Sequence, residues 1–219
     1  MGISRHREDY LRSILREKMQ PKEKTIINEV WSSLILDKEE VMVQSYPDLS
    51  FSLDGCVLWL SPRFREEGMW YDRSGCGNVC LHNNILSTPA LSTDQLTFFV
   101  KFDPSHFTQE HTTICAKVRD NSFQQGWSLR KRADILEFTV DTKKMQWPFP
   151  VSPSFFQGGY NKKYVIGQLN GVIGSPVPYG AGIMKSNEKM FVSPSIEELL
   201  YFNITIKEED QQLILAYLA

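Results

Sequence analysis

The residues of this sequence that could do chemistry are carboxylates, histidines and cysteines, and the spacing of the carboxylates argues against catalysis. A retaining glycoside hydrolase needs two carboxylates about 5 Å apart. No E-x-D-x-x-E pattern lies on a predicted strand, and Glu197 and Glu198 would point to opposite faces of one. The acids at positions 208–210 suit the start of a helix, where the helix dipole favours negative charge. The carboxylates therefore predict a protein that is not an enzyme.

Histidine and cysteine give no nucleophilic site. His82, His106 and His111 lie in turn-rich polar stretches, and the G-x-S-x-G motif of many hydrolases is absent. The cysteines are Cys56, Cys76, Cys80 and Cys115. The spacing between the second and third is not the C-x2-C of a zinc knuckle, so reduced thiols are expected. A zinc site formed by Cys76, Cys80, Cys115 and His82 is the alternative. A disulfide bond between Cys76 and Cys80 is a further alternative that the sequence leaves open.

Composition and charge indicate a globular protein with no chain-wide affinity for nucleic acid. The sequence has 219 residues, of which 42% are hydrophobic and 23% charged, and its formal net charge is −2. Residues 1–24 carry a net charge of +3, so the remainder is acidic. No apolar run reaches the roughly 18 residues of a membrane span, and the first residues lack a secretory h-region. Synthesis and retention in the cytoplasm are the resulting expectation.

Two stretches near residue 60 define where the main domain begins. Residues 57–60 form a short apolar run between Gly55 and Pro62, which predicts a buried strand. Residues 71–78 then read Tyr-Asp-Arg-Ser-Gly-Cys-Gly-Asn, which predicts a tight loop with at least one residue at positive φ.

Residues 1–50 differ from the rest and are predicted to form a helical docking arm and linker. Apolar residues recur at helical spacing over residues 6–19, and a second apolar stripe runs over residues 25–36. An arm of this length cannot bury both apolar stripes by itself. We therefore expect it to dock on another surface. The residues expected to make that contact are Tyr10, Leu11, Ile14, Leu15, Met19 and Trp31.

From residue 51 onward, short apolar runs alternate with turn residues, as in an all-β sandwich. The predicted strands are 57–60, 95–102, 112–118, 126–130, 135–141, 164–169, 190–192 and 196–204. Asn170-Gly171 predicts a hairpin turn, and Gly158-Gly159 are expected to be turn glycines. A capping box at Thr205-x-x-Glu208 predicts a closing helix.

The order of these motifs resembles LamG-like domains of the concanavalin A-like lectin/glucanase superfamily. The resemblance rests on Val57-Leu58-Trp59-Leu60 with the loop after it, the pair 114–117 and 126–130, the Asn170-Gly171 hairpin and the last strand. It covers about residues 51–219. It implies a fold that is all-β: a concanavalin A-like jelly-roll β-sandwich, here with an N-terminal helical arm and a short C-terminal helix.

The resemblance also implies sites. LamG-like domains often bind calcium at the sandwich rim, and Asp72 and Asn78 occupy the matching loop positions, although Cys76 replaces the usual Asn; an Asx turn made by Asp72 is the alternative. Glycan recognition in such sandwiches uses exposed aromatic rings. The aromatic residues in loop-like sequence are Trp147, Phe149, Trp70 and Tyr71. They are the expected ligand contacts.

These expectations combine into a non-enzymatic structural or adhesion protein, a virion component of a phage capsid or tail that displays a LamG-like module. LamG-like modules generally work outside cells, whereas this chain carries no export signal, and virion proteins leave the cytoplasm on lysis. The expected partners are other virion proteins, reached through the arm within an oligomeric assembly, and glycans. The alternatives are a cytoplasmic carbohydrate-binding module and a degenerate glycoside hydrolase.

Overall fold

The computed structural model describes residues 51–61, 65–66, 69–76, 78–81, 84–85, 95–118, 126–161, 163–179 and 190–219. The chain divides into two units, Met1–Ser50 and Phe51–Ala219, and every described residue belongs to the second unit. The helices expected in the arm lie outside the described residues and stay predictions. So do the docking residues Tyr10, Leu11, Ile14, Leu15, Met19 and Trp31.

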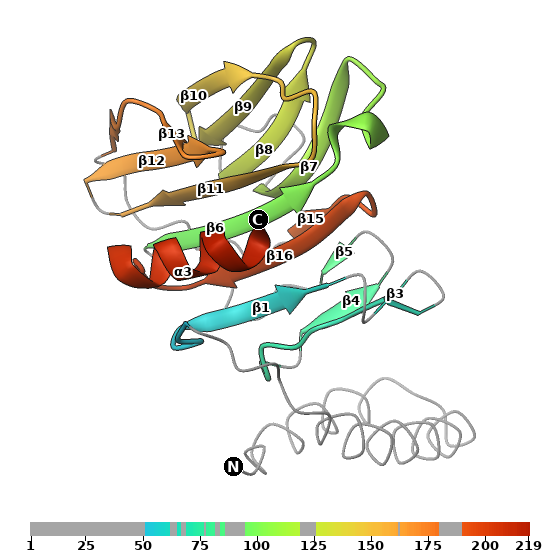
Figure 1. The fold of residues 1–219 in the computed structure, drawn as a ribbon, viewed down its shortest axis with the longest axis vertical. Coiled ribbons are helices and arrows are strands. Elements are labelled where there is room, and N and C mark those ends of the chain that lie inside the picture. Colours follow the sequence, from blue (N-terminus) through green and yellow to red (C-terminus); the bar gives the residue numbers. More distant parts are fainter. Residues whose placement is uncertain are drawn as a thin grey trace. The chain divides into compact units, whose positions relative to one another are not determined.

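The described strands form two antiparallel sheets, so the predicted all-β sandwich is confirmed (Figure 1). The first sheet runs in the order β1 (Cys56–Leu60), β16 (Ile196–Phe202), β6 (Leu96–Phe102), β11 (Ser154–Tyr160), β12 (Tyr164–Leu169) and β13 (Val172–Ile173), and β14 (Val177–Pro178) also pairs with β12. The second runs β10 (Lys143–Pro148), β9 (Ile135–Val140), β8 (Gly126–Arg132), β7 (His111–Val118), β15 (Met190–Val192), β5 (Asn84–Ile85), β4 (Val79–Leu81), β3 (Met69–Tyr71) and β2 (Arg65–Glu66). Each predicted strand overlaps an observed one.

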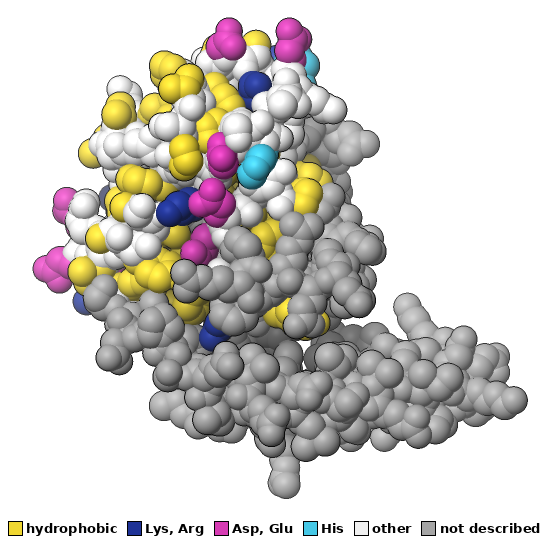
Figure 2. Space-filling view, turned by 45° about the vertical axis from the view of Figure 1, so that its right-hand side comes forward, with side chains coloured by type: hydrophobic (Ala, Val, Ile, Leu, Met, Phe, Trp, Pro, Cys, Tyr) yellow, Lys and Arg dark blue, Asp and Glu magenta, His cyan; other side chains and the backbone are white. Residues whose placement is uncertain are grey.

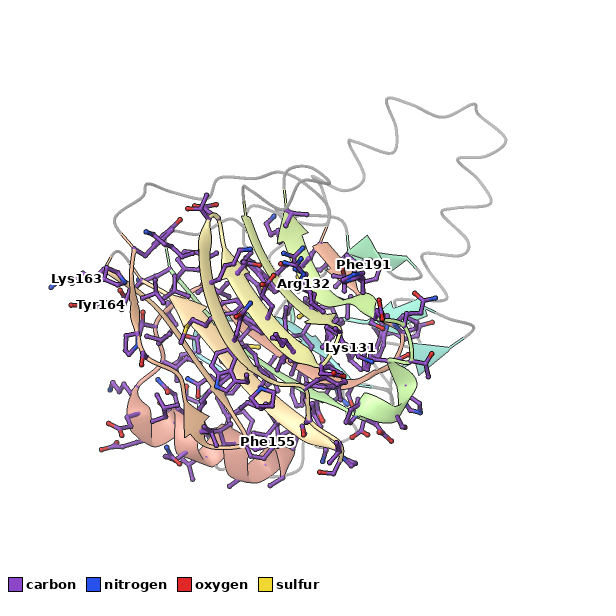
Figure 3. The ribbon with its side chains drawn as sticks, turned by 90° about the horizontal axis from the view of Figure 1, so that it is seen from above. Lys131, Arg132, Phe155, Lys163, Tyr164 and Phe191 are labelled. Atoms are coloured by element: carbon purple, nitrogen blue, oxygen red, sulfur yellow. The ribbon has the colours of Figure 1, made fainter. Side chains whose placement is uncertain are left out.

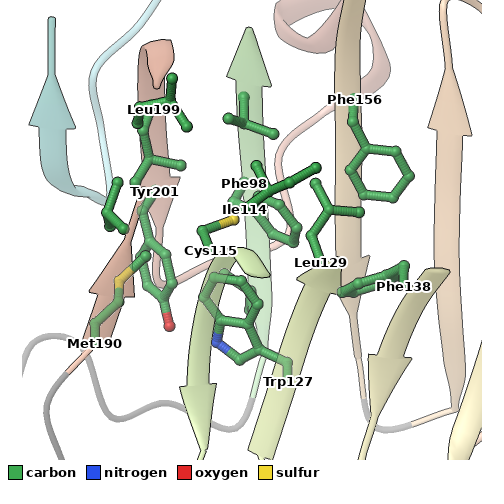
Figure 4. Close-up of a cluster of buried hydrophobic side chains, with 14 of the residues drawn as sticks. Phe98, Ile114, Cys115, Trp127, Leu129, Phe138, Phe156, Met190, Leu199 and Tyr201 are labelled. Atoms are coloured by element: carbon green, nitrogen blue, oxygen red, sulfur yellow. The ribbon is translucent and has the colours of Figure 1, made fainter. Parts of the chain in front are cut away.

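The core between the sheets is built around aromatic rings. Phe98 on β6 stacks on Trp127 of β8 with ring centroids 4.7 Å apart, and it also meets the rings of Phe138 and Phe156 (Figure 4). These four side chains are fully buried. Because aromatic side chains remove large areas from water and prefer such stacked and edge-on contacts, this cluster fixes how the two sheets face each other.

Strands β10 and β11 were not among the predicted strands, and β11 corrects the expectation for its glycines. Gly158 and Gly159 lie inside β11 rather than in a turn. A Cβ on Gly158 would lie 2.6 Å from the ring of Phe98, and one on Gly159 would lie 2.5 Å from the Leu96 carbonyl oxygen. Glycine is needed here because a ring and a neighbouring strand approach closely, as strand glycines often allow.

The closing helix is present, but its predicted capping box is wrong. Helix α3 (Glu208–Leu218) begins after Lys207 with no side-chain cap, and the Thr205 hydroxyl, which a capping box would use to accept from a helix N–H, instead donates to the side-chain oxygen of Gln95. The helix lies against β6 (Figure 1). Its Ile214 and Leu218 side chains are buried. Acidic residues fill its first turn, where they complement the helix dipole. Among the described residues, no helix combines the length and apolar character that crossing a membrane requires.

Candidate functional site

The candidate site is the outer surface of the second sheet over strands β7 to β10, which we call the polar face. Alternate residues of each strand point toward the core, so the intervening residues share the opposite side. Strand register aligns the polar face in three rows across β7, β8, β9 and β10. The rows are His111, Arg132, Ile135 and Pro148; Thr113, Arg130, Glu137 and Gln146; and Ala116, Ser128, Thr139 and Lys144.

Local sequence explains why these residues share one side. Leu136, Phe138 and Val140 of β9 are fully buried, so Glu137 and Thr139 between them face outward. Strand β10 follows the same period, since Met145 and Trp147 are buried and Gln146 is exposed. A register shift in β7 between Thr113 and Cys115 pairs both Thr113 and Ala116 with outward-facing residues of β8.

Glu137 is the centre of the polar face, and its carboxylate is completely buried. One carboxylate oxygen accepts Arg130 Nε at 3.0 Å and Nη2 at 2.6 Å, and Arg132 Nη1 lies 3.5 Å away. The other oxygen accepts Gln146 Nε2 at 2.9 Å and lies 3.9 Å from Lys144 Nζ. A buried charge is tolerated only when it is paired and hydrogen-bonded in this way.

The surroundings of Glu137 also fix its ionisation state. Burial by itself would raise the pKa of the Glu137 carboxyl. Hydrogen bonds from Arg130 and Gln146, together with the charges of Arg130 and Lys144, outweigh burial and hold the pKa below its usual value. The group is therefore a carboxylate at neutral pH.

Two cations on the polar face remain accessible to solvent. The side chain of Arg132 is 46% exposed and that of Lys144 is 48% exposed, whereas that of Arg130 is 19% exposed. Figure 3 labels Arg132 on β8 and Phe191 on β15, which continues the third row beyond Ala116. In this row, the hydroxyls of Ser128 and Thr139 lie 2.6 Å apart and are buried. The two exposed cations thus lie in different rows, Arg132 in the first and Lys144 in the third, and the hydroxyls between them in the third row are buried.

The aromatic residues expected to contact a ligand do not form an exposed platform. Trp147 lies on β10 and Trp70 on β3, and both are core residues with exposures of 6% and 3%. The Trp147 indole donates to the Val172 carbonyl and meets the Phe156 ring edge-on at 5.2 Å. Gly167 leaves room for it, since a Cβ there would lie 2.8 Å from the indole. The expected exposure of these two tryptophans is therefore wrong.

The other two predicted aromatics are half-buried, and their contact with a ligand stays a prediction. Tyr71 ends β3. Phe149 follows β10, and Lys131 Nζ lies 4.9 Å from its ring centroid while donating to the Phe107 carbonyl. Hydrophobic side chains do reach the surface elsewhere, as the space-filling view shows (Figure 2). The most exposed large ones in the described residues include Val151, Val172 and Ile173.

The loop that carries Asp72 and Asn78 is organised by the Asp72 carboxylate. One oxygen accepts from the backbone N–H groups of Trp59 and Ser74, at 3.1 and 2.9 Å. The other accepts from the Ser74 hydroxyl and from both the backbone N–H and the side-chain amide of Asn78. The same amide donates to the Val57 carbonyl at 2.6 Å. These bonds are the predicted Asx turn, extended so that it holds the loop against β1.

The expected positive φ in this loop is found at Gly75, where φ is +74°. The nearby Cys76, like Cys56 and Cys115, is a free thiol. Among the described residues, no three His, Cys, Asp or Glu side chains gather as metal ligands. Because five donors already point at the Asp72 carboxylate, a calcium ion would have to compete with them, and calcium binding by Asp72 and Asn78 stays a prediction.

Asp72→Asn is expected to lower the free energy of unfolding by about 3 kcal/mol, because the amide cannot accept from all five donors. Urea denaturation of the full chain, with calcium and after chelation, measures this loss. If the loop is held by hydrogen bonds alone, wild-type stability is the same in both conditions. Asp54→Asn, at an exposed position, should change stability by less than about 0.5 kcal/mol. A loss in Asp72→Asn no larger than this control would contradict the account.

Sequence reasoning missed the polar face, although a signal for it exists. Polar and apolar residues alternate over 128–130, 136–140 and 144–147. Period-two alternation predicts strands with one covered face and one open face. Read in that way, Arg130, Glu137 and Gln146 would have been placed outward, but their alignment in one row depends on the hairpin registers.

No protein-family model matches the chain, and no curated protein is similar to it in sequence. Among solved structures, the binding domain of botulinum neurotoxin DC in complex with rat synaptotagmin II is similar, with a TM-score of 0.59 and 12% identity over 76% of this chain and 52% of that chain. The same binding domain in complex with SialylT gives a TM-score of 0.57 and 13% identity over 77% and 52%.

A further similar structure concerns botulinum neurotoxin type C, whose cell entry is dependent upon interaction with two ganglioside molecules. It gives a TM-score of 0.58 and 13% identity over 76% of this chain and 52% of that chain. This protein therefore spans about half the length of the structures it resembles. At such low identity the likeness establishes the fold, which is the jelly-roll β-sandwich found in these toxin binding domains.

Proposed function

We propose that residues 51–219 form a non-enzymatic binding module that recognises a glycan or a protein through the polar face. The observation that carries the proposal is the Glu137 carboxylate, which is buried, held by Arg130 and Gln146, and flanked by the exposed side chains of Arg132 and Lys144. Solubility alone requires only exposed charges. A buried and fully paired charge with exposed donors around it is the kind of preorganised polar arrangement that binding sites use.

The chemistry of Glu137 supports binding rather than hydrolysis. The general acid of a glycosidase needs a raised pKa, whereas the pKa of Glu137 is lowered. The groups that contact its carboxylate are cations and an amide. The similar structures also support binding, since they are binding domains seen with a protein receptor and with SialylT.

A glycan array and a protein array probed with the full chain test the proposal. The expected result is binding to members of one array that falls at least tenfold in Gln146→Ala, which removes an exposed residue of the polar face. Gln168→Ala makes the same change on the first sheet and should leave binding unchanged. Binding that Gln146→Ala retains in full would place the site elsewhere, and release of reducing sugar from a bound glycan would restore the hydrolase alternative.

We further propose that the module is part of a virion, in which residues 1–50 attach it to a capsid or tail. The two apolar stripes of the arm support this, because such stripes need a surface to cover them. Deleting residues 1–50 should abolish incorporation into particles while the circular dichroism spectrum of residues 51–219 stays β-rich. Normal incorporation of this truncated chain would refute the attachment role. A cytoplasmic carbohydrate-binding module is the alternative.

A further inference from the structure

We infer that the ligand of the polar face is an acidic glycan, whose carboxylate lies between Arg132 and Lys144. The inference rests on the proposed function and adds the chemical class of the ligand. It follows from the charges on the polar face and from the hydrogen bonds that its donors and acceptors already make.

The polar face carries more positive than negative charge. Among its described residues, three cations, Arg130, Arg132 and Lys144, surround one carboxylate, that of Glu137. Arg130 supplies the two shortest ionic contacts, so it provides most of the charge compensation for Glu137. The other two cations contribute an excess of two positive charges at the surface, which favours an anion.

Arg132 and Lys144 are also placed to share one small anion. Arg132 Nη1 lies 3.5 Å from one oxygen of Glu137, and Lys144 Nζ lies 3.9 Å from the other. They approach the same carboxylate from the first and third rows, so their head groups flank it. Arginine has five N–H donors and lysine three, and these long contacts occupy only a small part of that capacity. A ligand carboxylate above Glu137 can therefore receive donors from both sides.

Glu137 acts as a positioning residue in this arrangement. Without it, the three cations would repel one another and their side chains would spread into solvent. With it, their head groups are gathered before the ligand arrives, which lowers the entropy cost of binding. Its own oxygens are directed to protein donors, so the ligand has to supply the second negative charge.

The neighbouring residues suit a sugar. Gln146 donates its amide N–H to Glu137, which leaves the amide oxygen as an acceptor for a hydroxyl group. Ile135 and Pro148 pair in the first row beside Arg132, and both are exposed. They provide an apolar ledge for the C–H face of a sugar ring. Two cations, an acceptor and a small apolar ledge around one carboxylate match one acidic sugar residue better than a long acidic peptide.

Sialyllactose and lactose test the inference, because they share a neutral core and differ in one acidic sugar. Full-length wild type should bind immobilised sialyllactose at least tenfold more tightly than lactose. Arg132→Gln and Lys144→Gln should each weaken sialyllactose binding about tenfold, because one charge-assisted hydrogen bond is lost. Lys163→Gln, at an exposed lysine away from the polar face (Figure 3), should bind as wild type does. Added salt should weaken the wild-type interaction.

Three outcomes would overturn the inference, and they are distinguishable. Equal binding of lactose and sialyllactose contradicts an acidic ligand but leaves the proposed binding function intact. Tighter binding of a polyglutamate peptide than of sialyllactose, with the same loss in Arg132→Gln, assigns the cations to an acidic peptide. An absence of binding on both arrays, with folding confirmed by circular dichroism, removes the proposed function together with the inference.

Discussion

Replacing Gly126 with alanine is expected to cost about 4 kcal/mol or more, most of the stability of an ordinary domain. Gly126 begins β8 with a φ of +111°, a conformation that residues with a Cβ rarely adopt. A Cβ would lie 2.1 Å from the Lys117 carbonyl oxygen, and because that atom belongs to the neighbouring strand it cannot move without breaking the β7–β8 pairing. Urea denaturation followed by tryptophan fluorescence measures the change.

Gly171→Ala is the matched control, because it introduces the backbone strain of a positive φ without a steric clash. Gly171 has a φ of +81° in the Asn170-Gly171 turn, but a Cβ there would meet no atom within 4 Å. The strain alone should cost about 1 kcal/mol. Similar losses in the two variants would show that β8 can move away from β7, contrary to the packing described. Since Arg130 and Arg132 lie on β8, Gly126→Ala should also abolish ligand binding.

Phe98→Ala is expected to cost about 4 kcal/mol, because it empties the centre of the aromatic cluster. The Phe98 ring is fully buried against three other rings, those of Trp127, Phe138 and Phe156. The two sheets hold these rings in place, so we expect the cavity to close only partly. Calorimetry should show a fall in Tm, and the near-ultraviolet circular dichroism of Trp127 should weaken.

Phe155→Ala is the matched control for this core substitution. Phe155 lies on β11 beside Phe156 but faces away from the core and is half-buried. The same ring is lost without opening an internal cavity, so the cost should be about 1 kcal/mol. Equal losses at the two positions would mean that the core repacks freely, which would contradict the close approach between Gly158 and the Phe98 ring.

Much of the sandwich was predictable from local pattern. The apolar run at 57–60 became β1, and the alternating stretch at 95–102 became β6. Asn170-Gly171 forms the predicted turn, with φ values of 49° and 81°, and Gly75 supplies the positive φ expected before Asn78. These features could be predicted from the sequence because each depends on a residue's own conformational preferences and on those of its immediate neighbours.

Features that depend on contacts between distant residues were not predictable in this way. Gly158 and Gly159 have the composition of a turn, yet they lie inside β11 because Phe98 and the backbone of Leu96 need the space. Trp147 has loop-like neighbours in sequence, but Val172 and Phe156, from other strands, enclose it. Thr205 bonds to Gln95, which is 110 residues away along the chain, instead of capping α3. Tertiary contacts override local preference in each case.

The polar face depends partly on local sequence pattern and partly on tertiary structure. The types of its residues and their alternation with buried neighbours are written in the chain, so their outward direction follows from a period of two. That Arg130, Glu137 and Gln146 share one row follows only from the hairpins after β8 and β9, since a slip of one residue would turn every side chain to the other face. Ala133 and Asp141, both with positive φ, form the turns that set those registers.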